Sequence, residues 1–224
     1  MSVVALIPAY QAAGTVGGVV RATQRFLREV IVVDDGSSDA TARIAREAGA
    51  QLLELGTHRG KGAALRRGFA HALDCGRSAV ITLDADGQHD PAEIPRLIER
   101  WRDTEAGIVI GSRAGSSDAM TPIRRFGNRF SRGAVSLFAG IPVSDPQSGF
   151  RLYAAALLRA IRLRGEGYEL ESEIVVKAAR AGFAVESVDI HLAQVDGTET
   201  SHYRPWRDTA RICWAVVRSR VWNA

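Results

Sequence analysis

The chain has 224 residues, of which 46% are hydrophobic and 24% charged, a composition typical of one folded globular domain with a sizeable core and not of a disordered chain. The 29 Lys and Arg exceed the 25 Asp and Glu by only four charges, so we expect no nucleic-acid partner, although anionic ligands or an anionic membrane surface fit. Cys75 and Cys213 lack the spacing of a disulfide framework or a zinc site, and a reduced, cytoplasmic setting is the simplest interpretation.

The apolar start of the chain does not have the pattern of a signal peptide. Met1 to Ile7 carries no basic residue and is interrupted by Pro8. No apolar run approaches the ~18 residues of a membrane-spanning helix. We therefore expect the protein not to cross a membrane by itself.

Short apolar strands and amphipathic helices alternate through the first half of the chain. The strands are predicted at 3–7, 30–33, 51–55, 79–83 and 107–110, and the helices at 15–27, 38–49, 63–73 and 91–101. This alternation favours an α/β fold with a mainly parallel sheet covered on both faces.

The pattern changes after about Ser112. One helical face is predicted between Ile123 and Leu137, followed by a loop to Gly149. Helices around 154–161 and 171–181, a strand at 184–190 and a polar, turn-rich segment at 197–205 complete the prediction. From Trp206 onward, apolar residues recur at helical spacing opposite arginines, which indicates either an interfacial helix or one packed on the core.

Two carboxylates follow the predicted strand at 79–83. Ligands of parallel sheets bind outside the carboxyl ends of the strands, where Asp84 and Asp86 would repel each other unless a cation lay near. We expect a Mg²⁺ or Mn²⁺ site in which Asp86, helped by Gln88, holds the ion against a diphosphate. The alternative is a pair of solvated loop acids or a helix cap.

Other strand ends carry further candidates for ligand binding. Asp35 could accept hydrogen bonds from a nucleobase or ribose, or belong to a turn, and Tyr10 with Pro8 and Ala9 could present an aromatic face and backbone groups. Lys61 lies between two glycines in an incomplete phosphate-loop pattern. Lys61 and Arg113 could each neutralise a phosphate or simply lie at the surface.

These segments together resemble the family 2 glycosyltransferases, and most closely the dolichyl- or polyprenyl-phosphate mannosyl- and glucosyltransferases. The matching motifs span nearly the whole chain in the family's order: IPAY, VVDDGSSDAT, RGKGAALRRGF, LDADGQHDP, IGSR, DPQSGFRLY, GYELESEIVVKAARAGF and SHYRPWRD. The resemblance implies a glycosyltransferase A-type, Rossmann-like fold, a nucleotide-sugar donor, a divalent metal and inversion at the anomeric carbon.

The resemblance also implies residue roles. It assigns nucleoside contacts to Pro8, Tyr10, Val33 and Asp35, ribose–diphosphate contacts to Asp84 and Ala85, metal ligation to Asp86 and Gln88, and donor binding to Arg113. Two positions depart from the family pattern. Gln11-Ala12 replaces the usual Asn-Glu, which puts a carboxylate contact near Ala12 in doubt, and His58 replaces a common Asn.

The expected reaction is transfer of a hexose to a polyprenyl phosphate. Metal and Arg113 would stabilise the leaving nucleoside diphosphate. A lipid phosphate is already anionic, because its second pKa is about 6, and needs no strong base. A saccharide or other hydroxyl acceptor would need a base, for which Asp145 and Glu173 are the candidates. The acceptor phosphate could be bound by five arginines, namely Arg124, Arg125, Arg129, Arg132 and Arg151.

We expect a catalytic domain at 1–204, with a nucleotide-sugar half at about 1–113 and an acceptor half at about 114–204, and a C-terminal amphipathic helix at 205–224. Peripheral contact with the inner face of the cell membrane or with a membrane protein would fit such an acceptor. A nucleotide-sugar-binding partner without activity is the non-enzymatic alternative. The acids Asp84 and Asp86 with Gln88 disfavour it.

Overall fold

The computed structural model describes residues 2–113, 133, 135–146, 148–191 and 193. Within them, the elements are β1 (Val3–Ala9), α1 (Val16–Thr23), β2 (Val30–Asp34), α2 (Thr41–Glu47), β3 (Gln51–Glu54), α3 (Lys61–Asp74), β4 (Ala79–Thr82), η1 (Pro91–Glu93), α4 (Ile94–Thr104), β5 (Ile108–Ser112), β6 (Arg151–Ala154), α6 (Ala155–Ala160), α7 (Glu169–Arg180) and β7 (Val185–Asp189). A short helical stretch also lies at 135–139.

The strands form one sheet in the order β3-β2-β1-β4-β6-β5-β7. β3, β2, β1 and β4 are parallel neighbours, and β5 is parallel to β7. β6 is antiparallel to both β4 and β5, between which it lies. The expected mainly parallel α/β sheet is confirmed, and β6 from the predicted acceptor half lies between two strands of the nucleotide half.

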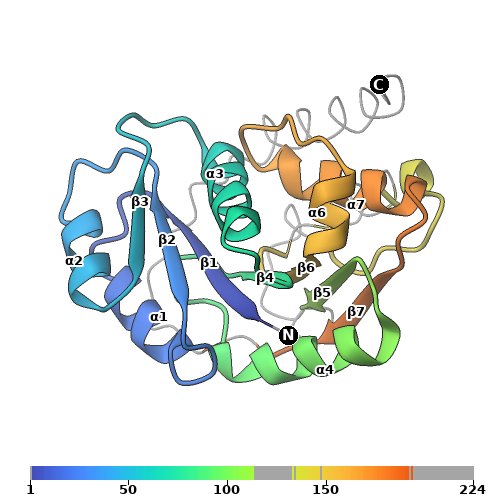
Figure 1. Ribbon diagram of the computed structural model, residues 1–224, viewed down its shortest axis with the longest axis horizontal. Helices are drawn as coiled ribbons and strands as arrows, with labels where there is room; N and C mark the ends of the chain where they lie inside the picture. Colours follow the sequence, from blue (N-terminus) through green and yellow to red (C-terminus); the bar gives the residue numbers. More distant parts are fainter. Residues whose placement is uncertain (1, 114–132, 134, 147, 192, 194–224) are drawn as a thin grey trace, which may run out of the picture.

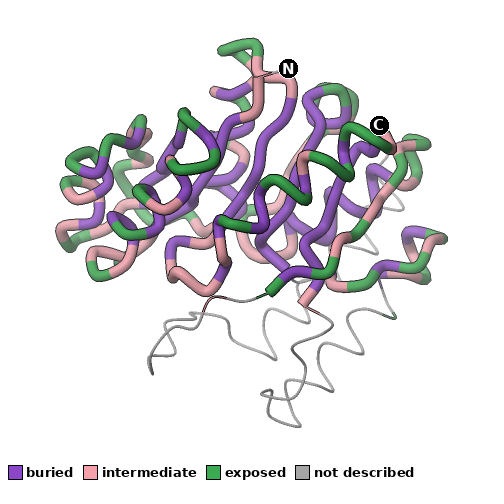
Figure 2. The backbone as a smooth tube through the Cα atoms, turned by 90° about the horizontal axis from the view of Figure 1, so that it is seen from below, coloured by how far each residue is buried: buried purple, intermediate pink, exposed green. Residues whose placement is uncertain are grey.

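Helices cover both faces of the sheet (Figure 1). One core layer joins α1, α2 and α4 to the sheet through Val20, Leu97 and Trp101, and the other joins α3, α6 and α7 through Leu65, Phe69 and similar side chains. Figure 2 shows buried strands between helices whose outer sides are exposed. The inner strands β1, β2, β4, β5 and β6 are buried because both faces of the sheet carry helices, and most of them are therefore continuous apolar runs.

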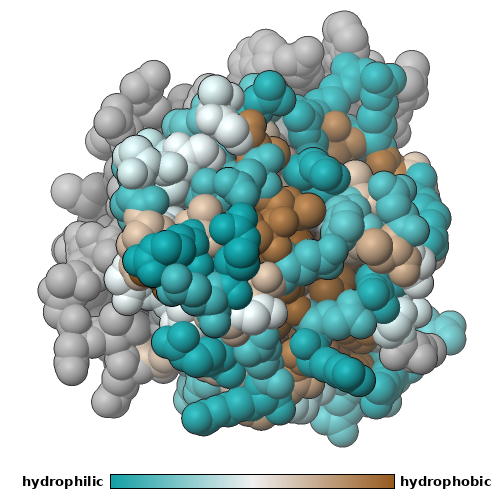
Figure 3. Space-filling model, turned by 60° about the vertical axis from the view of Figure 1, so that its left-hand side comes forward, coloured by the Kyte–Doolittle hydropathy of each residue, from teal (hydrophilic) through white to brown (hydrophobic). Residues whose placement is uncertain are grey.

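The sheet ends at β3 on one side. Its two middle residues, Leu52 and Leu53, are half-buried, and its outer residues Gln51 and Glu54 are exposed. Figure 3, in which the side of α2 and β3 is turned forward, shows hydrophobic residues in the gaps of a mostly hydrophilic surface. Polar residues of this kind discourage another strand from pairing with an exposed edge.

Several predicted boundaries were wrong. The helix expected from Ser38 begins at Thr41, since Asp39 accepts a hydrogen bond from the Thr41 backbone N–H (3.0 Å). Lys61, expected in a loop, is the first residue of α3. The strand β6 was not predicted, because its four residues directly precede a helix and give too short a pattern to register.

The predicted tail helix at 205–224, the segment at 197–205 and most of the predicted helical face at 123–137 lie outside the described residues. Within the described part of the chain, no helix is both long enough and apolar enough to span a membrane.

Candidate active site

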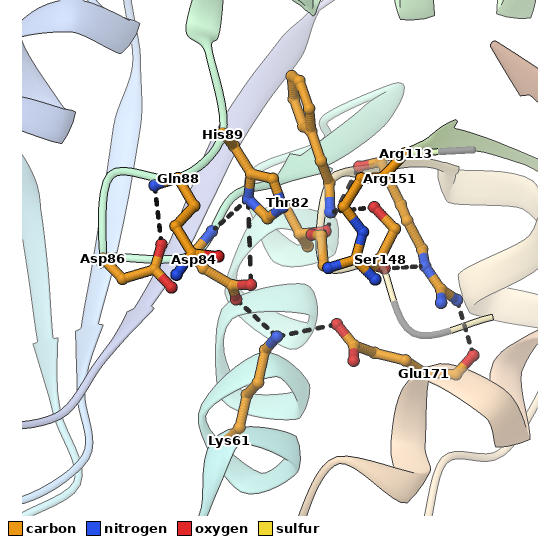
Figure 4. Close-up of polar contacts among 12 residues, drawn as sticks. Lys61, Thr82, Asp84, Asp86, Gln88, His89, Arg113, Ser148, Arg151 and Glu171 are labelled. Atoms are coloured by element: carbon orange, nitrogen blue, oxygen red, sulfur yellow. Dashed lines mark hydrogen bonds and ion pairs between the residues drawn. The ribbon is translucent and has the colours of Figure 1, made fainter. Parts of the chain in front are cut away.

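Lys61 lies at the centre of a partly buried ion-pair cluster just past the end of β4 (Figure 4). Its ammonium is 2.6 Å from Asp84 Oδ1 and 3.0 Å from Glu171 Oε1. Burial disfavours the charged form of Lys61, but the two carboxylates outweigh burial and raise its pKa above the ordinary value. Burial would likewise raise the pKa of Asp84, yet the Lys61 charge, with those of His89 and Arg113, lowers it to about 2.

The cluster changes the interpretation of the Gly-Lys-Gly segment. The Lys61 charge, predicted to neutralise a phosphate, is already balanced by two carboxylates in this structure. The two glycines permit close packing: a Cβ at Gly62 would lie 2.7 Å from the carbonyl oxygen of Gly167, and one at Gly60 would meet the carbonyl oxygen of Glu166 at 2.5 Å. The pattern therefore joins α3 to the segment before α7 and does not form a phosphate loop.

The Asp84 side chain is also confined by the segment that precedes β6. A Cβ at Gly149 would lie 2.9 Å from Asp84 Oδ1 and still closer to Oδ2, so only glycine leaves room for the carboxylate. The Thr82 hydroxyl donates a hydrogen bond to the Gly149 carbonyl (2.8 Å) and keeps the two segments together. A three-way contact of β4, α3 and the 148–150 segment thus fixes Asp84.

His89 supports the same loop from inside the protein. Its Nδ1 accepts a hydrogen bond from the Asp84 backbone N–H (3.2 Å), and its ring lies 5.3 Å from that of Phe150. Burial, opposed by the nearby Asp84 charge, lowers the pKa of His89 to about 4. The neutral ring can therefore act as an acceptor at neutral pH.

Asp86 contrasts with Asp84 in its surroundings. Both residues are half-buried, but the Asp86 Oδ1 accepts a hydrogen bond from the Gln88 backbone N–H (3.0 Å), whereas Asp84 is paired with the Lys61 ammonium. Burial and repulsion from Asp84 raise the pKa of Asp86. A nearby cation would relieve this repulsion, which makes Asp86 the more favourable carboxylate for a metal.

The donor set fits a hard divalent cation that is completed by a substrate. The described residues contain no group of three or more His, Cys, Asp or Glu side chains arranged to hold a metal. Mg²⁺ is often bound by one or two carboxylates plus substrate phosphates. Asp86 and the amide oxygen of Gln88 supply ligands of this type, whereas Asp84 is held by Lys61.

Arg113 and Asp145 form a second ion pair at the site. The Arg113 Nε and Nη2 donate to the two Asp145 oxygens at 2.7 and 3.0 Å, and the Arg113 backbone N–H donates to Oδ2 at 3.3 Å. Burial opposes the charge of each partner, but their pairing raises the pKa of Arg113 and lowers that of Asp145. Asp145, predicted as a base, thus orients the Arg113 guanidinium, and its lowered pKa makes it a weak proton acceptor.

Arg151 does not have the predicted role of an acceptor-phosphate ligand. Its side chain is fully buried, and its three guanidinium nitrogens donate to the backbone carbonyls of Pro146 (2.6 Å), Ser148 (2.6 Å) and Glu171 (2.9 Å). An anion cannot reach a guanidinium enclosed in this way. Arg151 instead joins the loop of Asp145 to the first turn of α7.

The structure also contradicts the prediction of Glu173 as a catalytic base. Its oxygens accept hydrogen bonds from the backbone N–H groups of Arg164 (3.1 Å) and Gly165 (2.8 Å), and Lys177 lies 2.6 Å away. The side chain is only 6% exposed. Glu173 therefore stabilises the turn before α7 and offers no accessible oxygen for an acceptor hydroxyl.

At the neighbouring strand end, Asp35 holds the loop that follows β3. Its oxygens accept hydrogen bonds from the backbone N–H groups of Arg59 (2.8 Å) and Gly60 (2.7 Å), and His58 Nδ1 lies 2.9 Å from Oδ2. The His58 ring stacks on Tyr10 with centroids 4.0 Å apart. Tyr10 and Asp35, both predicted to contact a nucleobase, therefore lie close together, and the His58 ring contacts both of them.

The remaining predicted residues differ in accessibility. Pro8, Ala9, Val33 and Ala85 are buried, and the Val33 side chain packs in the core, so a nucleoside contact at Val33 stays a prediction that involves its backbone. Arg124, Arg125, Arg129 and Arg132 lie outside the described residues. Gln11, where the family usually has Asn, accepts hydrogen bonds from the backbone N–H groups of Ser38 and Asp39 and thus stabilises the turn before α2.

Sequence reasoning missed Glu171, His89 and Gly149. The signal was present, since all three lie in the motifs GYELESEIVVKAARAGF, LDADGQHDP and DPQSGFRLY. Glu171 was passed over for Glu173, two residues further along the same helix, because the sequence does not tell which of them faces Lys61.

Solved structures with this fold include the glucosyl-3-phosphoglycerate synthase of Mycobacterium tuberculosis in complex with Mn²⁺, uridine diphosphate and phosphoglyceric acid. It aligns with a TM-score of 0.75 at 20% identity over 98% of this chain and 77% of its own. The mannosyl-3-phosphoglycerate synthase of Rubrobacter xylanophilus aligns with a TM-score of 0.73 at 22% identity over 99% of this chain and 73% of its own. Both likenesses establish the glycosyltransferase A-type fold.

Curated relatives found by sequence share a higher identity with this chain than these solved structures do. An undecaprenyl-phosphate mannosyltransferase of Micrococcus luteus is 32% identical over 86% of this chain and 87% of its own length. A dolichyl-phosphate beta-glucosyltransferase of Drosophila melanogaster is 33% identical over 90% of this chain and 67% of its own length. The sequence profile of Glycosyl transferase family 2 matches residues 4–162, and the chain therefore belongs to that family of glycosyltransferases.

Proposed function

We propose that this glycosyltransferase moves a hexose from a nucleoside diphosphate sugar to a polyprenyl phosphate, with inversion at the anomeric carbon and with Mg²⁺ or Mn²⁺. The printed names of the M. luteus and D. melanogaster relatives, a mannosyltransferase and a glucosyltransferase of polyprenyl-type phosphates, support this acceptor class. A lipid acceptor would bring the reaction to a membrane surface, and we expect the enzyme to act there as a peripheral protein on the cytoplasmic side.

The observation that carries the proposal is the state of the two candidate bases. Asp145 is engaged by the Arg113 guanidinium through both oxygens, and Glu173 is engaged by Lys177 and two backbone N–H groups. Neither is suited to accept a proton from an acceptor hydroxyl. A phosphate monoester needs no such base, because its second pKa is about 6 and its oxygen is already anionic at neutral pH.

The charged residues of the site have distinct tasks in this scheme. Asp86 and Gln88 would hold the metal, whose charge stabilises the departing diphosphate when it is bound. Arg113, fixed by Asp145, places a further positive charge near Asp84 and opposes the negative charge that develops on the leaving group. Lys61 and Glu171 keep Asp84 in place beside them.

Two alternatives are weaker. A hydroxyl acceptor would require Asp145 to leave Arg113 before it could take a proton, at the expense of a buried ion pair. A nucleotide-sugar-binding protein without activity is disfavoured because the M. luteus and D. melanogaster relatives are named as transferases.

The test is incubation of the purified protein with UDP-, GDP- and dTDP-sugars, undecaprenyl phosphate and Mn²⁺, with products identified by mass spectrometry. We expect one lipid-linked hexose, lost when a chelator is added and restored by excess Mn²⁺. Substitution Asp86→Asn should remove transfer while leaving the fold intact by circular dichroism, and Arg43→Met, on the exposed side of α2, is the matched control. Absence of a lipid-linked sugar across the whole panel would refute the proposed acceptor.

A further inference from the structure

We propose that the imidazole of His58 occupies the nucleobase position of the donor site and must be displaced when a nucleotide binds. This inference rests on the proposed use of a nucleoside diphosphate sugar. The ring of His58 stacks on Tyr10 at a centroid distance of 4.0 Å and an interplanar angle of 26°, and its Nδ1 lies 2.9 Å from Asp35 Oδ2. A flat ring that stacks on one face and donates an N–H at its edge uses the same contacts as a nucleobase.

Tyr10 and Asp35 lie next to each other because β1 and β2 are parallel neighbours with Ala9 opposite Asp34. Each follows the end of its strand, so an aromatic face and a carboxylate meet at the edge of the sheet where ligands of such folds bind. The same edge carries Asp84 and Asp86 past the end of the next strand, β4. A base held at Tyr10 and Asp35 would belong to the same ligand as a diphosphate held near Asp86.

A nucleobase cannot share these contacts with the imidazole. Rings whose centroids are 4.0 Å apart are in direct contact, which leaves no space for a second ring between Tyr10 and His58. The Asp35 oxygens also accept hydrogen bonds from the backbone N–H groups of Arg59 and Gly60. The outer acceptor position on Oδ2 is the one that His58 covers.

The imidazole is the part of this arrangement that can move. The side chain of His58 is 53% exposed, whereas that of Asp35 is 3% exposed. The backbone at 57–58 packs directly on Gly36, where an added Cβ would lie 2.6 Å from the His58 nitrogen, and the next two backbone N–H groups are held by Asp35. Rotation of the side chain alone would therefore open the position, without a movement of the loop.

The His58 imidazole would therefore compete with the nucleobase of the donor for the contacts with Tyr10 and Asp35. When only a fraction of the protein is in the binding-competent state, the apparent dissociation constant is the intrinsic constant divided by that fraction, and is therefore larger. Removal of the His58 ring should therefore tighten the binding of ligands that carry a base, and should not affect a diphosphate without one.

The experiment measures dissociation constants by calorimetry with Mn²⁺ for UDP, GDP, dTDP and inorganic pyrophosphate. We expect His58→Ala to lower the constant about threefold or more for at least one nucleoside diphosphate, with no change for pyrophosphate. His58→Phe keeps a ring for stacking but loses the donor to Asp35, and its constant should fall between those of the wild type and His58→Ala. His71→Ala, on the last turn of α3, is the matched histidine control.

Unchanged or weaker nucleotide binding in His58→Ala would overturn the inference and leave the proposed function standing. Tighter binding without any transfer to a polyprenyl phosphate would support the inference while the proposed acceptor failed. If no nucleoside diphosphate bound to either protein, both would be overturned. Circular dichroism of each variant excludes unfolding as the cause.

Discussion

Two acidic strand ends hold the same segment of the chain in different ways. Asp35, after β2, accepts hydrogen bonds from the backbone N–H groups of Arg59 and Gly60, which are neutral donors. Asp84, after β4, holds the next residue, Lys61, through an ion pair of 2.6 Å. Both carboxylates thus position the start of α3, but only Asp84 does so through an oppositely charged side chain.

The difference predicts where the molecule tolerates change. At Asp35, the half-exposed His58 can be removed while the backbone N–H groups of Arg59 and Gly60 still hold the carboxylate. At Asp84, removal of Lys61 leaves two carboxylates without their cation, and a side chain added at Gly149 crowds the Asp84 oxygens. We therefore expect larger effects of substitution at the Asp84 end than at the Asp35 end.

Lys61→Met should be the most destabilising of the four changes. It leaves the buried Glu171 and the partly exposed Asp84 as mutually repelling carboxylates without their cation. Breaking one partner of a fully buried pair costs about 3–5 kcal/mol, which is the upper bound for this change. The free energy of unfolding in urea measures the effect. Arg43→Met, which breaks the exposed pair with Glu47, is the control and should change stability by less than about 0.5 kcal/mol. Equal effects of the two substitutions would show that the cluster adds no stability.

Acid should weaken the Asp84 end through His89. The folded pKa of His89 is about 4, below the unfolded value of about 6.5, so the unfolded chain binds more protons between these values. The stability that depends on neutral His89 is complete above about pH 6.5 and is lost as the pH falls toward 4.

From pH 7 to pH 5 the wild type should lose about 2 kcal/mol more stability than His89→Asn, whose side chain keeps its charge state. Urea unfolding at the two pH values gives the comparison. A parallel loss in both proteins would mean that other groups cause the acid sensitivity.

Gly149→Ala should move Asp84 without removing any charge. The added Cβ lies 2.9 Å from Asp84 Oδ1 and closer to Oδ2, and overpacking of this kind costs about 1–3 kcal/mol. Gly14→Ala is the matched control, because a Cβ there would meet no atom within 4 Å. Thermal unfolding of both variants, with transfer activity as a second measurement, tests the effect. Wild-type stability and activity in Gly149→Ala would show that Asp84 has room to shift.

Asp35→Asn should have the smallest effect on stability. The amide keeps one oxygen acceptor but turns an N–H₂ group toward backbone donors, and the loss of one such hydrogen bond costs about 1–2 kcal/mol. Hydrogen exchange of the Arg59 and Gly60 amides should become faster in the variant. If both amides stayed as protected as in the wild type, the carboxylate would not be what holds this loop.

The sequence alone predicted most of the elements, though not β6, and the edge of the sheet at which the site lies. Apolar runs such as 79–82 form strands because they are buried on both faces, and that requirement is visible in the local pattern. The positions of Asp35, Asp84 and Asp86 after strands followed from the same pattern. Parallel strands bring their carboxyl ends to one edge, so these acids had to be close.

Only the tertiary structure decided the partner of each charged group. Lys61, Asp84 and Glu171 come from α3, the loop after β4 and α7, and no local pattern relates them. Arg151 was predicted to bind a phosphate because arginines often do, but the insertion of β6 between β4 and β5 buries it against three carbonyls. Residue type sets which contacts a side chain can make, whereas the order of strands in the sheet sets which of them it makes.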